Sequence, residues 1–244
     1  MLTFLRKIRK SLIESESARK YILYAIGEIL LVMIGILLAL QVNNWNEGKK
    51  RMSFEREMLQ DISKGLDLNI RQLEQGIKSC NHAVNSCRII LRFLDEEIDY
   101  HDSLIQHFSR PFRWFRPTIT NSGYESLKSY GRNLVRNDSI RDQLEIYDYE
   151  WIHVLHERQE QFYNVTVSPI LSKLFTQVIF SLQIQSDDQM RPYNIDELKK
   201  SREYYHIINT LKSNREGQAW WYDNWLDSLK KLSSFIEEEL NKGK

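Results

Sequence analysis

Two glutamate and histidine pairs have the residue types and spacing that could hold a metal ion. Glu150 stands three residues before His153, and Glu203 stands three residues before His206. Residues three apart in a helix lie on one face, and Glu-x-x-His is the pattern by which helices supply ligands to a carboxylate-bridged di-iron centre. A pair of such helices would make the chain a di-metal enzyme.

A complete di-metal site also needs an inward-facing glutamate on each of two further helices. Glu74, Glu96 and Glu97 of the first long helical pattern lie off its apolar stripe, and the first Glu-x-x-His pair also lies beside the stripe of its helix. The sequence has no Gly-rich phosphate loop, nucleophile elbow or Cys-x-x-Cys pair. We therefore predict no catalytic residues, no enzyme activity, no cofactor and no metal, and the metal candidates that remain are Glu150, His153, Glu203 and His206.

A short segment rich in arginine and aromatic residues, SRPFRWFRP at residues 109–117, could bind a ligand or partner. Its two prolines stop a helix, and its arginines interleave with aromatic rings in a way that suits an anionic ligand, membrane headgroups or a glycan. Alternatively, the rings cap the end of a helical bundle while the arginines face water. The candidate patch consists of Arg110, Arg113, Trp114, Phe115 and Arg116.

An apolar stretch at residues 21–42 predicts the element that positions the rest of the chain. Its helical length of about 33 Å matches a hydrocarbon core of about 30 Å. The apolar region of a cleaved signal peptide is shorter and ends in small residues, whereas this one ends in Leu40, Gln41 and Val42. We therefore expect a retained transmembrane helix.

Basic residues on both sides of the apolar stretch predict its orientation. The cations before it are Arg6, Lys7, Arg9, Lys10, Arg19 and Lys20, and those after it are Lys49, Lys50, Arg51 and Arg56. This bias favours a cytoplasmic N-terminus and a C-terminal domain outside the cytoplasm. The basic tail either lies on anionic lipid as an amphipathic helix or serves as a topology signal alone.

One carboxylate interrupts the apolar stretch and predicts association within the membrane. Glu28, Val32, Gly35 and Ala39 share a helical face, where small residues would let a second backbone approach and the carboxyl could hydrogen-bond across the interface. A homo-oligomer or another membrane protein would be the partner, besides the lipid bilayer itself. Alternatively, Glu28 reaches toward the inner headgroups.

The remaining chain has the patterns of long helices. One apolar stripe consists of Leu59, Ile62, Leu66, Asn69 and Leu73, and a second stripe runs from Ile77 to Ile98. The four-residue step between them is a stutter beside Gly76. We expect one very long helix, or two nearly collinear helices with a bend near Gly65 or Gly76.

Ser122 and Glu125 predict a capping box at the start of a short helix, and Asn137 or Asp138 is expected to cap a longer one. Asn194 with Glu197 is expected to open another helix, and a last helix follows. The helix after Asn194 is expected to place the following residues inward: Leu198, Tyr205, Ile208 and Leu211. The predicted fold is all-α, with one N-terminal transmembrane helix, a long helix and an antiparallel extracytoplasmic helical bundle; residues 178–184 fit helix or strand.

Charge and cysteine usage narrow the classes of function. The 34 basic and 33 acidic residues nearly balance, which argues against a general nucleic-acid binder. Cys80 and Cys87 would lie about 10.5 Å apart in a helix, beyond the limit of about 7 Å for a disulfide. They are either buried thiols or thiols that meet their mates in a parallel dimer.

The block YAIGEILLVMIGILLALQVNNWNE, preceded by a basic tail, resembles the N-terminus of a family of uncharacterised bacterial single-pass membrane proteins. The segment Gly123–Gly131 with residues 137–141 is similar to a second block of that family. This resemblance implies a bacterial inner membrane and no known activity. The predicted regions are a cytoplasmic tail (1–20), a transmembrane helix (21–42), a linker and long helix (43–108) and the remaining bundle (109–244).

Three functions fit these patterns. The first is a membrane-anchored interaction or scaffold module with a periplasmic domain. The second is a ligand sensor, which would require a pocket near Arg110, Arg113 and Trp114, and a membrane partner because the tail of about 20 residues is too short for an output domain. The third is the di-metal enzyme.

Overall fold

The computed structural model describes residues 18–113, 115–149, 157–170, 180–181, 190–192 and 194–242. Almost all of them are helical, and the strands described are β1 Phe180–Ser181 and β2 Arg191–Pro192, which pair antiparallel. The prediction of an all-α chain is confirmed. The other elements are α2 Ala18–Leu94, η1 Asp102–Leu104, α3 Ile105–Ser109, η2 Arg110–Phe112, α4 Ser122–Tyr130, η3 Arg132–Leu134, α5 Asp138–Asp148, α6 Glu157–Phe162, η5 Tyr163–Val167, α8 Ile195–Lys200 and α9 Arg202–Lys242.

The chain divides into two compact units, Met1–Glu55 and Arg56–Lys244. The described part of the first unit is the beginning of α2, and its apolar side chains are exposed on all sides of the helix. Of the described helices, α2 is the one long and apolar enough to cross a membrane. Apolar residues all around a helix suit lipid as the surrounding solvent.

The second unit begins with the part of α2 that has a single buried stripe. Leu59, Ile62, Leu66 and Leu73 are buried as predicted, and so are Cys80, Val84 and Cys87 further along the helix. The stripe then moves by one residue: Ile90 and Phe93 are completely buried, whereas Leu91 is half-buried. The stutter therefore does not interrupt α2, which is continuous past both glycines. Of the two predicted forms, the single very long helix is confirmed.

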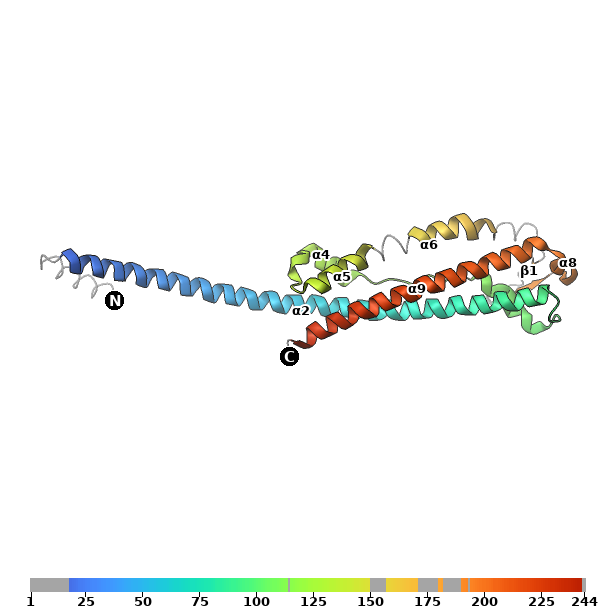
Figure 1. The fold of residues 1–244 in the computed structure, drawn as a ribbon, viewed down its shortest axis with the longest axis horizontal. Helices are drawn as coiled ribbons and strands as arrows, with labels where there is room; N and C mark the ends of the chain where they lie inside the picture. The colour runs from blue at the N-terminus through green and yellow to red at the C-terminus, as the bar shows by residue number, and fades with distance from the viewer. Residues whose placement is uncertain are drawn as a thin grey trace. The chain divides into compact units, whose positions relative to one another are not determined.

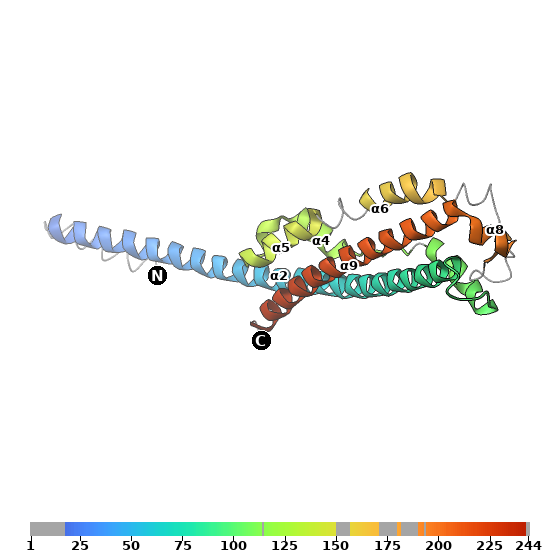
Figure 2. The ribbon, with the colours of Figure 1, turned by 45° about the vertical axis from the view of Figure 1, so that its right-hand side comes forward.

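Helix α9 packs antiparallel to this part of α2, as both ribbon views show (Figures 1 and 2). Arg88 pairs with Glu216 at 2.9 Å, and Glu74 pairs with Lys230 at 3.3 Å. A step of 14 residues back along α2 (88 to 74) thus matches a step of 14 residues forward along α9 (216 to 230). The two ion pairs share one register, so the apolar stripes of the helices face each other.

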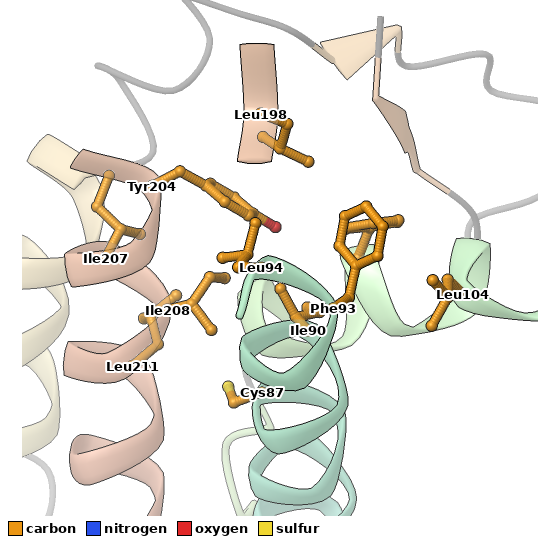
Figure 3. Packing of buried hydrophobic residues seen from close by; sticks show 11 residues of the cluster. Cys87, Ile90, Phe93, Leu94, Leu104, Leu198, Tyr204, Ile207, Ile208 and Leu211 are labelled. Carbon is orange, nitrogen blue, oxygen red and sulfur yellow. The ribbon is translucent and has the colours of Figure 1, made fainter. Parts of the chain in front are cut away.

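A hydrophobic cluster closes the end of this helix pair (Figure 3). Cys87, Ile90, Phe93 and Leu94 of α2 meet side chains from the beginning of α9 and from the short helices between them. The Phe93 ring makes edge-to-face contacts with Tyr100 and Phe108 at centroid distances of 6.1 and 6.0 Å. The remaining members of the cluster are Leu104, Leu198, Tyr204, Ile207, Ile208 and Leu211.

Residues 115–121, here called the crossing segment, run along α2 in the opposite direction. Asn69 holds this segment: its Nδ2 donates to the carbonyl oxygen of Thr120 at 2.9 Å, and its Oδ1 accepts from the Thr120 amide at 2.8 Å. The same Nδ2 donates to the Tyr147 hydroxyl of α5 at 2.9 Å. The polar residue in the predicted apolar stripe therefore pairs with a loop backbone that would otherwise lack partners.

Three helix starts test the predicted caps. The side chain of Asn137 accepts from the amides of Ser139 and Ile140, and that of Asn194 accepts from the amides of Asp196 and Glu197. Both predicted caps are confirmed. The predicted capping box of Ser122 with Glu125 is wrong, because Ser122 is already helical and Asn121 occupies the cap position.

Two helix ends also differ from the predicted pattern. Helix α2 ends at Leu94, four residues before the last residue of the predicted stripe, and Glu96 at φ 60° turns the chain. Near the C-terminus the chain breaks at Ser201 and then forms α9 as a single helix of 41 residues. This break buries Tyr204 and leaves Tyr205 on the surface, whereas the sequence pattern predicted Tyr205 inside.

Candidate functional site

The metal candidates do not form a described metal site. Glu203 and His206 are exposed on α9, while Glu150 and His153 lie outside the described residues. Within the described part of the chain, no group of three or more His, Cys, Asp or Glu side chains could hold a metal ion. The described residues therefore offer no geometry for a di-metal mechanism, and the absence of metal stays a prediction.

A hollow of about 280 Å³ lies where α2 meets the chain around η2. It is lined by Arg110 and Arg113 of the predicted patch and by one face of α2. The α2 residues are Gln75, Lys78, Ser79, His82 and Ala83. We call this feature the basic hollow, because three of its lining residues are permanent cations and, in the part of the chain described, none is acidic.

The periodicity of the helix brings the α2 side of the basic hollow together. Its residues follow one another at steps of three and one, so they occupy two adjacent rows of a single helical face. Val84 and Cys80, on the neighbouring face, are buried, whereas Lys78 and His82 are exposed. The buried stripe of α2 therefore determines the direction in which the polar row points.

A buried arginine of α9 holds the other side of the basic hollow. Arg215 is 2 % exposed and donates through Nη2 to the carbonyl oxygens of Pro111 at 3.4 Å and Arg113 at 2.5 Å. Hydrogen bonds from a charged donor are stronger than neutral ones. This clamp acts on the backbone between Arg110 and Arg113, so it places their side chains over α2.

The surroundings of Arg215 form a small polar network inside the helix pair. Its Nη1 donates to Gln218 Oε1 at 2.8 Å, and Gln218 Nε2 donates to the Tyr222 hydroxyl at 2.8 Å. The Cys80 thiol of α2 donates to the same Gln218 oxygen at 3.4 Å. Burial lowers the pKa of Arg215 from its ordinary value, and nearby Cys80, Tyr222 and Cys87 oppose that shift.

The predicted patch divides between two environments. Arg110 and Arg113 line the basic hollow, but Arg116 lies over the Tyr163 ring at 5.2 Å from its centroid. Phe115 packs toward α2, where a side chain at Gly76 would come within 3.4 Å of the Phe115 ring and 2.9 Å of the Tyr222 ring. Trp114 lies outside the described residues. The ligand-binding role of this patch and its alternative, an aromatic cap on the bundle, both stay predictions.

The electrostatic effect of the basic hollow reaches a neighbouring histidine. His107 of α3 shares a hydrogen bond of 3.0 Å with Ser86 of α2. Burial lowers its pKa, and the positive charge of Arg110 lowers it further. Arg110 itself donates to Gln106 Oε1 at 3.2 Å, a neutral acceptor that leaves the guanidinium charge in place. Burial and the Arg110 charge thus both favour the neutral imidazole of His107.

The sequence interpretation missed the α2 side of this site and Arg215. Lys78 and His82 share a polar face of α2, but sequence alone cannot show which loop covers that face. Arg215 had a clearer signal: it follows Leu211 by four residues in the apolar stripe of α9 and precedes Tyr222 by seven, at the spacing of the buried residues. A charged residue at a stripe position indicates a buried polar partner.

The predicted intramembrane face lies in the first unit. Glu28, Val32, Gly35 and Ala39 are all exposed, and a side chain at Gly35 would meet no atom within 4 Å. Because α2 is continuous here, their spacing places them on one face of the helix. The face is open in this chain, and its occupant stays a prediction.

Comparison with known proteins identifies a region without assigning an activity. Residues 28–103 match the model of a family of unknown function, DUF6090. The match includes most of the apolar stretch and the α2 side of the basic hollow, and it ends before Arg110 and before the segment Gly123–Gly131. No curated protein and no solved structure matches the chain.

Proposed function

We propose that this chain is a single-pass, membrane-anchored helical interaction module, not an enzyme, and that it binds through the basic hollow. The observation that carries the binding role is the clamp of Arg215 on the backbone of Pro111 and Arg113. Burying a charge is costly unless good hydrogen bonds compensate it. Positioning Arg110 and Arg113 over the hollow would account for the cost of burying Arg215.

The proposed location is the bacterial inner membrane, with the N-terminus in the cytoplasm and Arg56–Lys244 in the periplasm as a helical bundle. The apolar, exposed stretch of α2 supports the anchor. The larger number of cations before that stretch supports the orientation. Trp45 supports an interface just beyond the apolar residues, because Lys49 lies over its ring at 3.8 Å, as in an aromatic belt beside charged headgroups.

Membrane anchoring is tested by extraction. The full chain should stay in the membrane pellet at alkaline pH, and the double variant Leu31→Lys/Leu37→Lys should be released, because each lysine costs about 3 kcal/mol in the middle of a bilayer. The variant Ser53→Lys/Gln60→Lys adds the same charge outside the apolar stretch and should stay in the pellet. Release of the unchanged chain would refute the anchor.

Orientation is tested by a fusion at the C-terminus. Alkaline phosphatase joined after Lys244 should be active, because that enzyme needs an oxidising compartment for its disulfides. A fluorescent reporter that folds in the cytoplasm should be dark at the same position. The opposite pair of results would place the domain in the cytoplasm.

Binding at the basic hollow is tested by photo-crosslinking in native membranes. A photoreactive residue at Gln75, which lines the hollow, should give a discrete adduct. The matched control is Gln60, an exposed glutamine of the same helix about 22 Å away along its axis. Equal labelling at both positions, or none at either, would argue against a binding role for the hollow.

A ligand sensor that acts through a membrane partner is the second candidate. It is favoured by the specific observation that a hollow opens beside Arg110 and Arg113. Its partner would bind the Glu28 and Gly35 face of the apolar stretch, because both residues are exposed on one face of α2. A ligand that changes association of this face would favour the sensor over the scaffold.

A further inference from the structure

We propose that the outer face of α9 around Trp220 binds a basic segment of a partner protein through arginine or lysine side chains. This face, here called the Trp220 surface, consists of Glu216, Gly217, Trp220, Asp223, Asn224 and Asp227. None of these residues lines the basic hollow. The inference therefore goes beyond the proposed function and adds a second interaction surface with the chemistry of its partner.

The spacing of the Trp220 surface places it opposite the packed face of α9. Tyr222 belongs to the buried stripe of this helix, together with Arg215 and Leu229 at steps of seven residues. Trp220 precedes Tyr222 by two residues, which is a rotation of about 200° around the helix. Its side chain is accordingly 60 % exposed, and the other residues of the surface are exposed as well. The whole face is accessible in this chain.

The Trp220 ring is supported from one side and open on another. It contacts the Trp221 ring edge-to-face at a centroid distance of 5.0 Å, and Trp221 lies 6.2 Å from the ring of buried Trp225. A side chain added at Gly217, one turn before Trp220, would meet no atom within 4 Å. A supported aromatic ring with open space beside it binds a partner at a low cost in side-chain entropy.

The charges beside the ring select a cation. Asp223 and Asp227 follow Trp220 by three and seven residues, and Glu216 precedes it by four; residues at these spacings are neighbours on a helical face. Glu216 pairs with Arg88 at 2.9 Å, whereas Asp223 and Asp227 form no ion pair with any described residue. None of the residues three, four or seven positions from Trp220 is basic. Two carboxylates thus remain for a partner to neutralise.

Arginine and lysine side chains match both features of the Trp220 surface. Tryptophan is the aromatic side chain that attracts a cation most strongly over its ring, and a carboxylate can accept two hydrogen bonds from one guanidinium. Tryptophan and arginine also supply much of the binding energy of protein interfaces. A partner protein with a basic segment therefore fits this surface.

The same charges disfavour two other occupants. The headgroups of anionic lipids would be repelled by Asp223 and Asp227, whereas they attract basic protein segments. A second copy in a two-fold dimer would place this surface against itself, so that its carboxylates would face each other. Both occupants are outcomes that the experiments below distinguish from a basic partner.

The first test measures binding of a capped peptide with three arginines to the full chain in micelles of an uncharged detergent, by titration calorimetry. The wild-type chain should bind, and its affinity should fall as the salt concentration rises. Trp220→Ala should bind about fivefold more weakly, and so should Asp223→Asn/Asp227→Asn. These positions are exposed, so the variants should keep the helical circular dichroism of the wild type.

Two control variants and a control peptide show whether binding depends on this surface and on charge. Asp67→Asn/Glu237→Gln removes two carboxylates from exposed positions elsewhere and should bind as the wild type does. Trp45→Ala removes an exposed tryptophan whose ring Lys49 already covers at 3.8 Å and should also bind normally. A peptide with citrulline in place of arginine keeps the shape without the charge and should not bind.

Three results of the titrations would overturn the proposal. They are no binding of the arginine peptide by the wild type, equal affinity of the surface variants and the control variants, and equal binding of the citrulline peptide. The first two would refute the surface as a binding site, and the third would refute its preference for a cation.

The second test identifies the occupant in native membranes. A photoreactive residue at Asn224, which is exposed within the surface, should form an adduct with a protein through a peptide that contains arginine or lysine. An adduct with a second copy of the chain or with lipid, or no adduct, would overturn the proposed partner. The adduct at Gln75 tests the basic hollow separately, so either surface can fail without the other.

Discussion

Two stretches of helix α2 have the same backbone conformation and opposite environments. Leu31 in the apolar stretch is 73 % exposed, whereas Leu73, further along the helix, is completely buried. Residues 22–42 are apolar on every face, and residues 56–94 bury one stripe and present polar residues elsewhere. An apolar side chain in α2 therefore has two possible roles, and the pattern around the helix distinguishes them.

The spacing of apolar residues along a helix therefore indicates its environment more reliably than the number of apolar residues does. A stripe with steps of three and four implies a protein neighbour on one side. Apolar residues without a stripe imply the same environment on all sides, which lipid provides. Matched substitutions in the two stretches test this difference in environment.

The largest difference is expected for the removal of a large apolar side chain. Phe93→Ala should lower the free energy of unfolding by about 3 to 5 kcal/mol, because it leaves a cavity in the cluster around α2 and α9. Leu37→Ala in the apolar stretch should leave the unfolding of Arg56–Lys244 unchanged. Urea unfolding in detergent, followed by tryptophan fluorescence, measures both. Equal losses would show that the two stretches unfold as one unit.

The next largest difference is expected for asparagine. Asn69→Ala should cost about 2 to 3 kcal/mol, because it removes three hydrogen bonds to Thr120 and Tyr147 and leaves buried backbone groups without them. Asn46→Ala, at an exposed position of the same helix, should change the same unfolding energy by less than about 0.5 kcal/mol. An unchanged free energy of unfolding in Asn69→Ala would show that Asn69 does not hold the crossing segment.

The cysteines report on the packed stretch alone, because the chain has two, Cys80 and Cys87, and both are buried. Burial raises the pKa of Cys80 to about 11 and of Cys87 to about 12, from 9.0. The thiols therefore lose their protons at a lower pH in the unfolded chain than in the folded chain. The stability that they contribute is complete below about pH 9 and falls as the pH rises toward 11.

Alkaline unfolding measures this effect. Each thiol should lower the free energy of unfolding by about 1.4 kcal/mol per pH unit in that window, and the slope should decrease in Cys80→Ala/Cys87→Ala. At pH 8 both thiols should react with iodoacetamide only after denaturation, since the thiolate is the reactive form. Rapid labelling of the native chain would contradict their burial.

The smallest effect is expected within the apolar stretch, where one face differs from the others. Glu28→Leu and Gly35→Leu should each weaken association in a transmembrane reporter by about 1 kcal/mol, because they remove a hydrogen bond and a close backbone approach. Leu37→Ile, on the opposite face of the helix, should have no effect. An unchanged signal in the first two variants would leave Glu28 as a residue that reaches toward headgroups.

Local signals allowed several features to be predicted. The stripe of α2 from Leu59 to Cys87 follows from apolar spacing, and the caps at Asn137 and Asn194 follow from side chains that bond to amides two and three residues ahead. The burial of Tyr204 instead of Tyr205 could not be predicted in this way. Adjacent tyrosines have equal apolar character, and the break at Ser201 decides which of them faces the cluster.

The basic hollow shows the same division within one site. Arg110 and Arg113 could be predicted as site residues from their charge and from Pro111 between them, which are local features of the sequence. The sequence did not show that Phe115 instead lies beside Gly76 and Arg116 over the Tyr163 ring. Lys78 and His82 joined the site because residues distant in sequence pack over one face of α2.

The all-α class, the apolar stretch and the direction in which the buried face of α2 points could be read from the sequence, because they depend on side chains within a few turns of one helix. The return of α9 along α2 and the Arg215 clamp on Pro111 and Arg113 follow from tertiary packing. Those contacts join residues 102 to 104 positions apart. Partners at that separation are selected by the packing of whole elements, which no local periodicity encodes.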